Sequence, residues 1–442
     1  MKKKNIKIIV IAVALFLPYW STAQDLIRRV NISEPNFALV RQLSGQAKWI
    51  ECYDFRDIYP YTGSSYFGLF DTVGNTNHFM ICDQSIDVYD MELVGNTLYF
   101  CGSKYDGLSV SRKGVMGYYD ITSMPTPTIN YILYDSLTTL KKLDYYMLYA
   151  TKHVVMVGTG RNGKDYIVDA YHYSNPLYPN NTSWGKAWTY ITNDNTKFDD
   201  IAVVDTNVVV SARFSDSSVA YLCYIRKNTM IDRPFFSGSV IGTKKIKADP
   251  KGPVLLMAGN YDTLYAFFRN SYYLQIHQLK GTHELTAKRI MVDLPLPFFT
   301  NTLELLDVCT DFNRRNLGVL LGKRNSSIDY KVYHIPTSKV SSGGTITGHI
   351  FNVDNDRVFS LGRSWKNNRT IAAGGHFDGA FYEVQNNVTG NCFSTFSSTL
   401  QNDTPVDANV QQKYHTAVRT YSVPSTMTVT EIQGIMTTLQ CD

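Results

Sequence analysis

An aromatic-rich strand pattern returns along the chain at a nearly constant interval, and it constrains the fold more than any other feature. Successive copies are 49, 51, 54, 52, 56 and 51 residues apart, and they begin at Tyr66, Val115, Tyr166, Ala220, Tyr272, Ile328 and Gly379. Self-similarity at a fixed interval of 20–50 residues is typical of repeat architectures. The chain is therefore expected to build one small unit of structure again and again.

A second pattern precedes the aromatic strands. Residues 90–102 read DMELVGNTLYFCG, and residues 200–212 read DIAVVDTNVVVSA, so the two align without a gap. Each has an initial Asp, a polar corner and an apolar run that ends in small residues. Looser copies begin at Asp144, Lys247 and Asp307. No segment keeps a helical period, and short apolar runs between Gly, Asn, Asp, Ser and Pro indicate an all-β chain.

A unit of about fifty residues with three or four strands is typical of a β-propeller, and the chain resembles that superfamily. A four-stranded blade has two apolar faces, which it buries by packing against its neighbours around a ring. We predict a seven-bladed β-propeller within residues 24–390, followed by a short C-terminal β-rich segment at 391–442. Two tandem β-sandwiches are the alternative, but sandwich strands recur every 8–12 residues without a longer period.

No specific propeller family is indicated. The chain has no recurring Gly-His…Trp-Asp pattern, and its Ala-Ala-Gly-Gly stretch, which ends in Gly374-Gly375, occurs once. With a leader cleavage site at Ala23-Gln24 and a Tyr/Asn/Asp-rich style, it looks like exported propeller proteins of Bacteroidetes-type bacteria. That resemblance implies no particular activity.

The N-terminus predicts export. Lys2, Lys3 and Lys4 form a basic start, Ile8–Leu17 is an apolar run too short to span a bilayer, and Ala23 ends a small-residue cleavage site. Residues 1–23 are expected to be a signal peptide, which leaves no transmembrane anchor; an uncleaved anchor is the alternative. The mature protein would be periplasmic, cell-surface or extracellular.

The charge of the mature chain argues against nucleic acid as a partner. The formal net charge is +5, and residues 1–23 hold four Lys and no acid, so the mature net charge is 5 − 4 = +1. No Lys/Arg-rich stripe remains that could track a phosphate backbone.

Seven cysteines allow a disulfide, since export leads to an oxidising compartment. Cys392 and Cys441 bracket the C-terminal segment and are the predicted pair. Cys101, Cys223 and Cys309 lie in apolar runs and are expected to be buried. No Cys or His spacing suggests a metal site, and no cofactor is predicted.

Two groups of residues are candidates for ligand binding. Trp184, Trp188, Tyr59 and Tyr61 lie in aromatic loops that could stack on sugars or anchor a protein. Asp90, Asp144 and Asp200 begin the repeat and are expected near one rim of the ring. They either cap backbone N–H groups in turns or form an acidic ring around the central opening.

The favoured hypothesis is an exported, non-catalytic propeller that binds a glycan or protein. No Gly-x-Ser-x-Gly or His-Glu-x-x-His motif is present, so no catalytic residue is predicted. The alternative is a glycoside hydrolase or polysaccharide lyase that uses carboxylates at the central pocket. A third possibility is an assembly component that makes contact through its C-terminal segment. The ligand and the oligomeric state stay open.

Overall fold

The structure is a computed structural model of the chain. The residues that it describes are 26–30, 37–42, 48–56, 63–71, 76–82, 86–105, 111–124, 126–148, 151–174, 182–184, 188–192, 196–205, 207–214, 220–226, 240–246, 252–270, 272–280, 283–292, 303–311, 313–322, 330–351, 357–363, 369–375, 379–385, 393–403, 415–419, 422–427, 429–431 and 437–441. They are nearly all β-structure, as the sequence predicted. Besides the turns between strands, the described residues include a helix, α3 (Thr337–Ser342), and a 3₁₀ turn at Ile121–Ser123.

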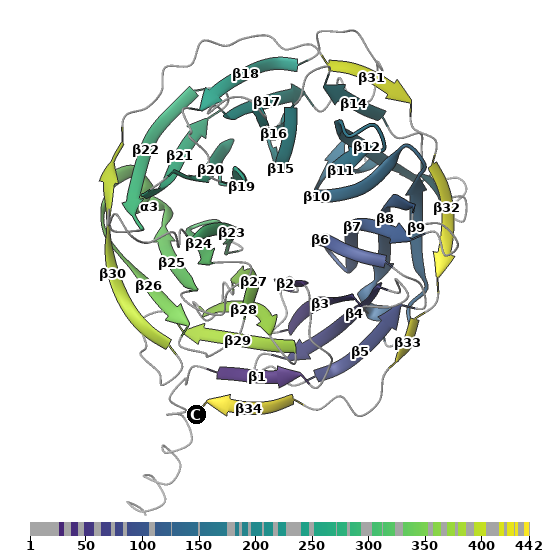
Figure 1. Ribbon diagram of the computed structural model, residues 1–442, viewed down its shortest axis with the longest axis horizontal. Helices are drawn as coiled ribbons and strands as arrows, with labels where there is room; N and C mark the ends of the chain where they lie inside the picture. The colour runs from purple at the N-terminus through teal and green to yellow at the C-terminus, as the bar shows by residue number, and fades with distance from the viewer. Residues whose placement is uncertain are drawn as a thin grey trace, which may run out of the picture.

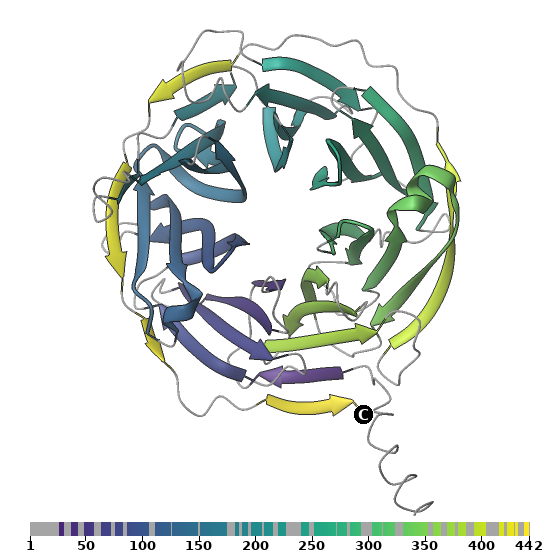
Figure 2. The same ribbon diagram turned by 180° about the vertical axis from the view of Figure 1, so that it is seen from behind.

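The sheets stand around a central opening in a propeller-like ring (Figures 1 and 2). The chain builds antiparallel sets of four strands, each ordered from the centre outward. The first three sets are β2 (Phe37–Gln42), β3 (Lys48–Arg56), β4 (Gly63–Asp71) and β5 (Thr76–Cys82); β6 (Ile86–Val94), β7 (Thr97–Tyr105), β8 (Arg112–Asp120) and β9 (Ile129–Tyr134); and β10 (Leu137–Leu148), β11 (Thr151–Gly160), β12 (Asp165–Ser174) and β14 (Trp188–Thr192), with β13 (Thr182–Trp184) also on β12.

The next sets follow the same plan. They are β15 (Thr196–Val204), β16 (Asn207–Phe214), β17 (Ala220–Arg226) and β18 (Val240–Ile246); β19 (Leu255–Ala258), β20 (Thr263–Arg269), β21 (Tyr273–Lys280) and β22 (His283–Met291); β23 (Glu304–Thr310), β24 (Asn316–Gly322), β25 (Lys331–Pro336) and β26 (Gly344–Phe351); and β27 (Arg357–Arg363), β28 (Arg369–Gly375) and β29 (Gly379–Gln385). The last set has three consecutive strands, and its fourth strand is β1 (Leu26–Val30) from the N-terminus.

The innermost strands close a circuit. Each contacts the next in the order β2, β6, β10, β15, β19, β23 and β27, and β27 contacts β2 in turn. The antiparallel pairing of β1 with β29, in which Arg28 lies opposite Phe381, joins the two ends of the repeat in one sheet. The ring is therefore closed by backbone hydrogen bonds between the two ends of the repeat, in addition to the contacts between inner strands.

The C-terminal segment runs around the outside of the ring. Its strands are β30 (Phe393–Asn402), β31 (His415–Arg419), β32 (Ser422–Met427), β33 (Val429–Glu431) and β34 (Thr437–Cys441). β30 pairs with both β22 and β26, and so joins two sets into a nine-stranded sheet. β31, β32, β33 and β34 then add to β14, β9, β5 and β1 respectively. The segment thus adds strands to the outer edges of the ring and follows it in the direction opposite to the main chain (Figure 1).

The core lies between neighbouring sets, because the middle strands are buried on both faces. In β11, Val154 and Met156 pack into the cluster shared with the preceding set, whereas Val155 and Val157 pack into the cluster shared with the following one. Successive side chains of a strand point to opposite faces. The near-continuous apolar runs of the sequence therefore reflect two buried faces.

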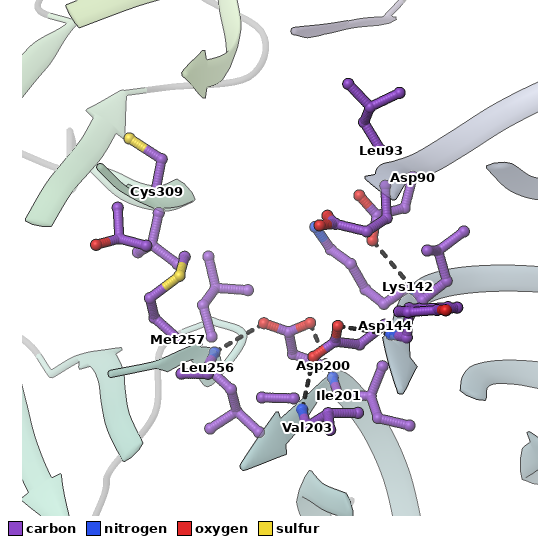
Figure 3. Close-up of a pocket in the computed structure, with 18 of the residues that line it drawn as sticks. Asp90, Leu93, Lys142, Asp144, Asp200, Ile201, Val203, Leu256, Met257 and Cys309 are labelled. Carbon is purple, nitrogen blue, oxygen red and sulfur yellow. Dashed lines mark hydrogen bonds between the residues drawn. The ribbon is translucent and has the colours of Figure 1, made fainter. Parts of the chain in front are cut away.

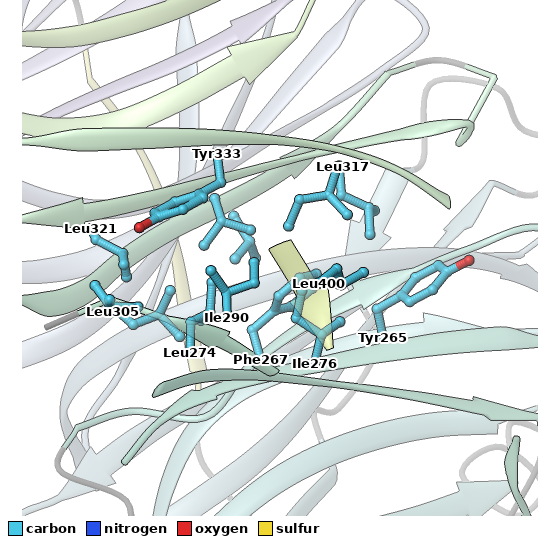
Figure 4. Close-up of a cluster of buried hydrophobic side chains, with 14 of the residues drawn as sticks. Tyr265, Phe267, Leu274, Ile276, Ile290, Leu305, Leu317, Leu321, Tyr333 and Leu400 are labelled. Atoms are coloured by element: carbon cyan, nitrogen blue, oxygen red, sulfur yellow. The ribbon is translucent and has the colours of Figure 1, made fainter. Parts of the chain in front are cut away.

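The C-terminal segment contributes to this core. Leu400 of β30 is 2% exposed and packs in the cluster between the sets of β19–β22 and β23–β26 (Figure 4). Burying a leucine side chain contributes roughly 1.5–3 kcal/mol relative to leaving it exposed. We infer that β30 stabilises the ring as well as covering its edge.

Candidate functional site

Several inner strands of the ring carry a β-bulge near their middle. The pairing shifts by one residue between Val88 and Asp90, between Phe198 and Asp200, and between Leu305 and Asp307. β10 has the same irregularity between Leu140 and Lys142. A bulge re-aims the residues beside it and increases the local twist. In three of these strands, the residue just after the bulge is an aspartate.

The aspartates of the inner strands connect neighbouring sets. Four of them, called here the bridging aspartates, accept a hydrogen bond from a backbone N–H of the next inner strand around the ring. The bonds run from Leu143 N to Asp90 Oδ2 (3.0 Å), from Val203 N to Asp144 Oδ2 (2.5 Å), from Leu256 N to Asp200 Oδ2 (2.7 Å) and from Leu361 N to Asp307 Oδ2 (2.9 Å).

The second oxygen of three bridging aspartates is also engaged. Asp144 Oδ1 accepts from Tyr145 N at 2.6 Å, Asp200 Oδ1 from Ile201 N at 2.8 Å, and Asp307 Oδ1 from Val308 N at 2.9 Å. These bonds are to the backbone of the residue that follows. The carboxyl groups thus cap N–H groups within a strand and across the gap to the next strand.

The bulge explains the small residues in the later part of the second strand of the repeat, Gly102 in β7 and Gly158 in β11. A Cβ at Gly102 would overlap the carbonyl oxygen of Asp87 on β6, and a Cβ at Gly158 would overlap that of Thr139 on β10. The structure assigns the crowding to the backbone of the adjacent inner strand, which approaches where its pairing is irregular.

A cavity of about 760 Å³ lies among the inner strands. All of β19 lines it, whereas the other inner strands that line it contribute residues from their later halves. Residues of following turns, such as Gly95, Asp205 and Arg314, also line it, so it opens toward one face of the ring. Figure 3 shows Asp90, Asp144 and Asp200 gathered on one side of this cavity, with Met257 and Cys309 opposite. The three aspartates predicted from the sequence are therefore brought together, and they both cap backbone groups and line the central opening.

Burial perturbs two of these carboxyl groups. It raises the pKa of Asp144 to about 6 and that of Asp200 to about 7, although backbone hydrogen bonds act in the opposite direction. Lys142 also opposes the shift at Asp200, and Arg314 opposes it at Asp144. Desolvation disfavours the charged form of an acid. Both carboxyl groups consequently titrate close to neutral pH.

The charges that line the cavity are mostly negative. Its acidic residues are Asp90, Glu92, Asp144, Asp200, Asp205, Asp307 and Asp311, and its basic residues are Lys142 and Arg314. Asp307 and Lys142 were not among the residues singled out from the sequence. Asp307 heads a loose copy of the repeat, which was the available signal. Lys142 occupies the position after the bulge where three other inner strands have aspartate, so only the pairing register identifies it.

The aromatic candidates lie elsewhere or outside the described residues. Trp184 is in β13 and Trp188 in β14, at the outer part of their sheet, and nothing is described of their side chains. Tyr59 and Tyr61 lie outside the described residues. The structure thus places the strands of the two tryptophans away from the cavity, and binding by these four residues stays a prediction.

The cysteines fall into two groups. Cys101, Cys223 and Cys309 are all buried, as their apolar surroundings in the sequence predicted, and burial raises the pKa of the Cys101 thiol. Cys441 lies in β34, where Ile27 of β1 is opposite it. Cys392 lies outside the described residues, so the Cys392–Cys441 disulfide stays a prediction.

Two other features would bear on function, namely metal-binding clusters and helices that span a membrane. Among the described residues, no three His, Cys, Asp or Glu side chains are placed to hold a metal ion. In the same part of the chain, no helix is long and apolar enough to cross a membrane.

Comparison with known proteins gives little further information. No protein-family model matches the chain, and no curated protein is similar to it in sequence. Among solved structures, it is similar to the GH32 β-fructofuranosidase BmSUC1 of Bombyx mori, with 8% identity, a TM-score of 0.28, and coverage of 86% of this chain and 94% of that chain. A likeness at this TM-score supports no argument about fold or activity.

Proposed function

We propose that this chain is an exported, seven-bladed β-propeller that binds a glycan or protein ligand at the face where the central cavity opens, and that it does not catalyse a reaction on that ligand. The blade count follows from assigning each inner strand of the closed circuit to one blade, with β1 as the outer strand of the last blade. In this assignment β30 bridges the fifth and sixth blades.

The observation that carries the binding proposal is the cavity together with the way its carboxyl groups are used. A concave site of about 760 Å³ is large enough for a small ligand or for side chains of a partner. Both oxygens of Asp144, Asp200 and Asp307 accept backbone N–H bonds. An oxygen held in this way is poorly placed to exchange a proton with a substrate. These carboxyl groups are therefore better suited to shape a site than to perform chemistry in it.

One observation favours the enzymatic alternative. Carboxyl groups with raised pKa values in a cavity are candidates for the general acid of a glycoside hydrolase, and Asp144 and Asp200 meet that description. The test is release of reducing ends from a panel of neutral and acidic polysaccharides. Activity that is lost in Asp200→Asn, while the variant stays folded at the temperature and pH of the assay, would establish the alternative.

The binding proposal is tested with the mature protein, beginning at Gln24, on a glycan array and against immobilised peptides. Two sets of variants locate the ligand. Trp184→Ala with Trp188→Ala removes the outer aromatic residues, and Met147→Ser with Tyr261→Ser changes the face of the cavity. Tyr272→Ser is the control, because this exposed residue precedes β21 at the end of its sheet opposite Tyr261. Absence of any ligand in both formats would refute the proposal.

Export and placement beyond the inner membrane are part of the proposal and rest on the N-terminal residues alone. Lys2–Lys4, the apolar run and Ala23 support a cleaved leader. Mass measurement of the intact protein from an exporting host should find a chain that begins at Gln24. A mass that includes residues 1–23 would contradict it.

A further inference from the structure

Residues at the ends of five inner strands (β6, β10, β15, β19 and β23) and in the described turns that follow them lie on one side of the cavity, and they are called here the inner-turn rim. It comprises Glu92–Gly95, Met147, Asp205, residues 259–262, and Asp311 with Arg314. All of these line the cavity except residues 259–262, which directly follow Ala258, a lining residue. The rim therefore belongs to one face of the ring.

Large apolar side chains are exposed on this rim. Tyr261 is 92% exposed and Met147 is 49% exposed, while Leu93 is partly exposed beside the cavity. Exposed Tyr and Met side chains are typical anchors of protein–protein interfaces. Because Tyr261 and Met147 do not pack in the core, a partner can contact them without disrupting the packing of the unbound protein.

The turn that carries Tyr261 is held against the next set of strands. Asn260 Nδ2 donates to Asn313 O at 3.0 Å, and Arg314 Nη1 donates to Gly259 O at 2.7 Å. These bonds tie the β19–β20 turn to the β23–β24 turn. The backbone that carries Tyr261 is thus held in place before binding, which reduces the conformational entropy that is lost when a partner binds.

The charge of this face is complementary to a cation. Seven acidic residues and two basic residues line the cavity, an excess of 7 − 2 = 5 negative charges when all are ionised. Asp205 is exposed at the rim, whereas the bridging aspartates are deeper. Low-dielectric walls lined by one sign of charge concentrate the field in a cleft. An anionic glycan would be repelled there, and a neutral glycan would gain nothing from the charge.

We propose that the inner-turn rim docks a polypeptide segment of a partner protein that places an arginine or lysine side chain in the mouth of the cavity, with Tyr261 and Met147 against apolar residues on either side of it. The inference rests on the proposed function and selects a protein ligand over a glycan. A guanidinium or ammonium on a long apolar stem matches a negative cavity with an apolar rim.

The probes are fluorescein-labelled peptides of the sequence Gly-Ser-Leu-Xaa-Leu-Ser-Gly, in which Xaa is arginine, lysine, citrulline or glutamate. Citrulline keeps the shape of arginine and removes its charge. Fluorescence anisotropy with the mature protein should give affinities for the arginine and lysine peptides about tenfold or more tighter than for the citrulline peptide. The difference should shrink between low and high salt, because exposed charges are screened.

Variants assign the binding to the rim. Tyr261→Ser and Met147→Ser should each weaken the arginine peptide several-fold, and Asp205→Asn should reduce the preference for arginine over citrulline. The controls are Tyr272→Ser and Glu304→Gln. Glu304 is exposed at the start of β23, at the end opposite Asp311, so it tests charge removal away from the rim. Neither control should change the affinity.

The outcomes separate this inference from the proposed function. Equal affinity for the arginine and citrulline peptides, or no arginine binding up to about 1 mM, overturns the inference. So does a loss that is as large in the controls as in the rim variants. Glycan binding that the rim variants abolish, without peptide binding, overturns the inference and keeps the proposed function. If the rim variants change neither glycan nor peptide binding, the proposed site itself is wrong.

Discussion

Replacing Asp200 by asparagine tests whether burial or hydrogen bonding dominates at the bridging aspartates. Asp200 is 7% exposed and accepts from Ile201 N and Leu256 N. Asparagine has nearly the same shape and cannot ionise. The substitution therefore removes the charge and exchanges one acceptor oxygen for an amide donor. Its effect on stability should depend on pH, because the wild-type side chain changes its charge in the accessible range.

The magnitude follows from the shift of the Asp200 pKa from 3.8 to about 7. The folded-state pKa lies above the unfolded one, so the group's contribution to stability is fully present below pH 3.8 and is lost as the pH rises through about 7. A shift of this size corresponds to about 4 kcal/mol over the full range, at about 1.36 kcal/mol for each pKa unit. Between about pH 5 and pH 8, the free energy of unfolding of the wild type should fall by about 3 kcal/mol relative to that of Asp200→Asn.

The assay is urea denaturation of both proteins at several pH values across this window, followed by tryptophan fluorescence. Differences between the two proteins cancel the titration of all other groups. Asp120→Asn is the control, because the pKa of Asp120 is shifted down rather than up. Hydrogen bonds from Thr122 lower the pKa of this exposed carboxyl group, so its folded and unfolded values both lie below the window. The difference between wild type and Asp120→Asn should therefore stay constant across it.

Two results would refute the reasoning. A difference between wild type and Asp200→Asn that does not change with pH would mean that the carboxyl group does not titrate in this range. A difference that changes in the other direction, with the wild type gaining stability as pH rises, would mean that the two N–H bonds outweigh desolvation. In that case Asp200 would be a stabilising anion.

Three further predictions concern the fold. Gly102→Ala should destabilise the protein by about 1–3 kcal/mol or more through overlap with the adjacent strand, whereas Gly252→Ala, with nothing within 4 Å of its Cβ position, should not; equal thermal midpoints would contradict this. Deletion of residues 428–442 removes β33 and β34 and leaves the edges of β5 and β1 open, so light scattering should show aggregation and the thermal midpoint should fall; an unchanged midpoint would show that these strands are dispensable. Peptide mapping without reductant should find Cys392 joined to Cys441, a link expected to stabilise by about 4 kcal/mol in the chain-entropy model; separate thiol peptides would exclude it.

The repeat in the sequence was sufficient to predict an all-β ring, because it reflects packing requirements that act within each repeat unit. Every middle strand must be apolar on both faces, as in Val154–Val157, and the second strand must carry a small residue such as Gly102 opposite the bulge of the inner strand. These constraints act within one unit and recur with it. The aspartate at the start of the unit could be found in the same way, since Asp90 and Asp200 align without a gap.

The remaining features depend on contacts between residues far apart in the chain, and no periodicity records them. The pairing of β1 with β29 closes the ring. The five C-terminal strands each pair with particular outer strands, although any exposed outer edge could accept an added strand. The cavity depends on the ring as well. Asp90 accepts its hydrogen bond from a strand 53 residues later, and Lys142 joins the aspartates only because β10 lies between β6 and β15. The residues of the candidate site were therefore present in the sequence, but their meeting at one opening was decided by closure of the ring.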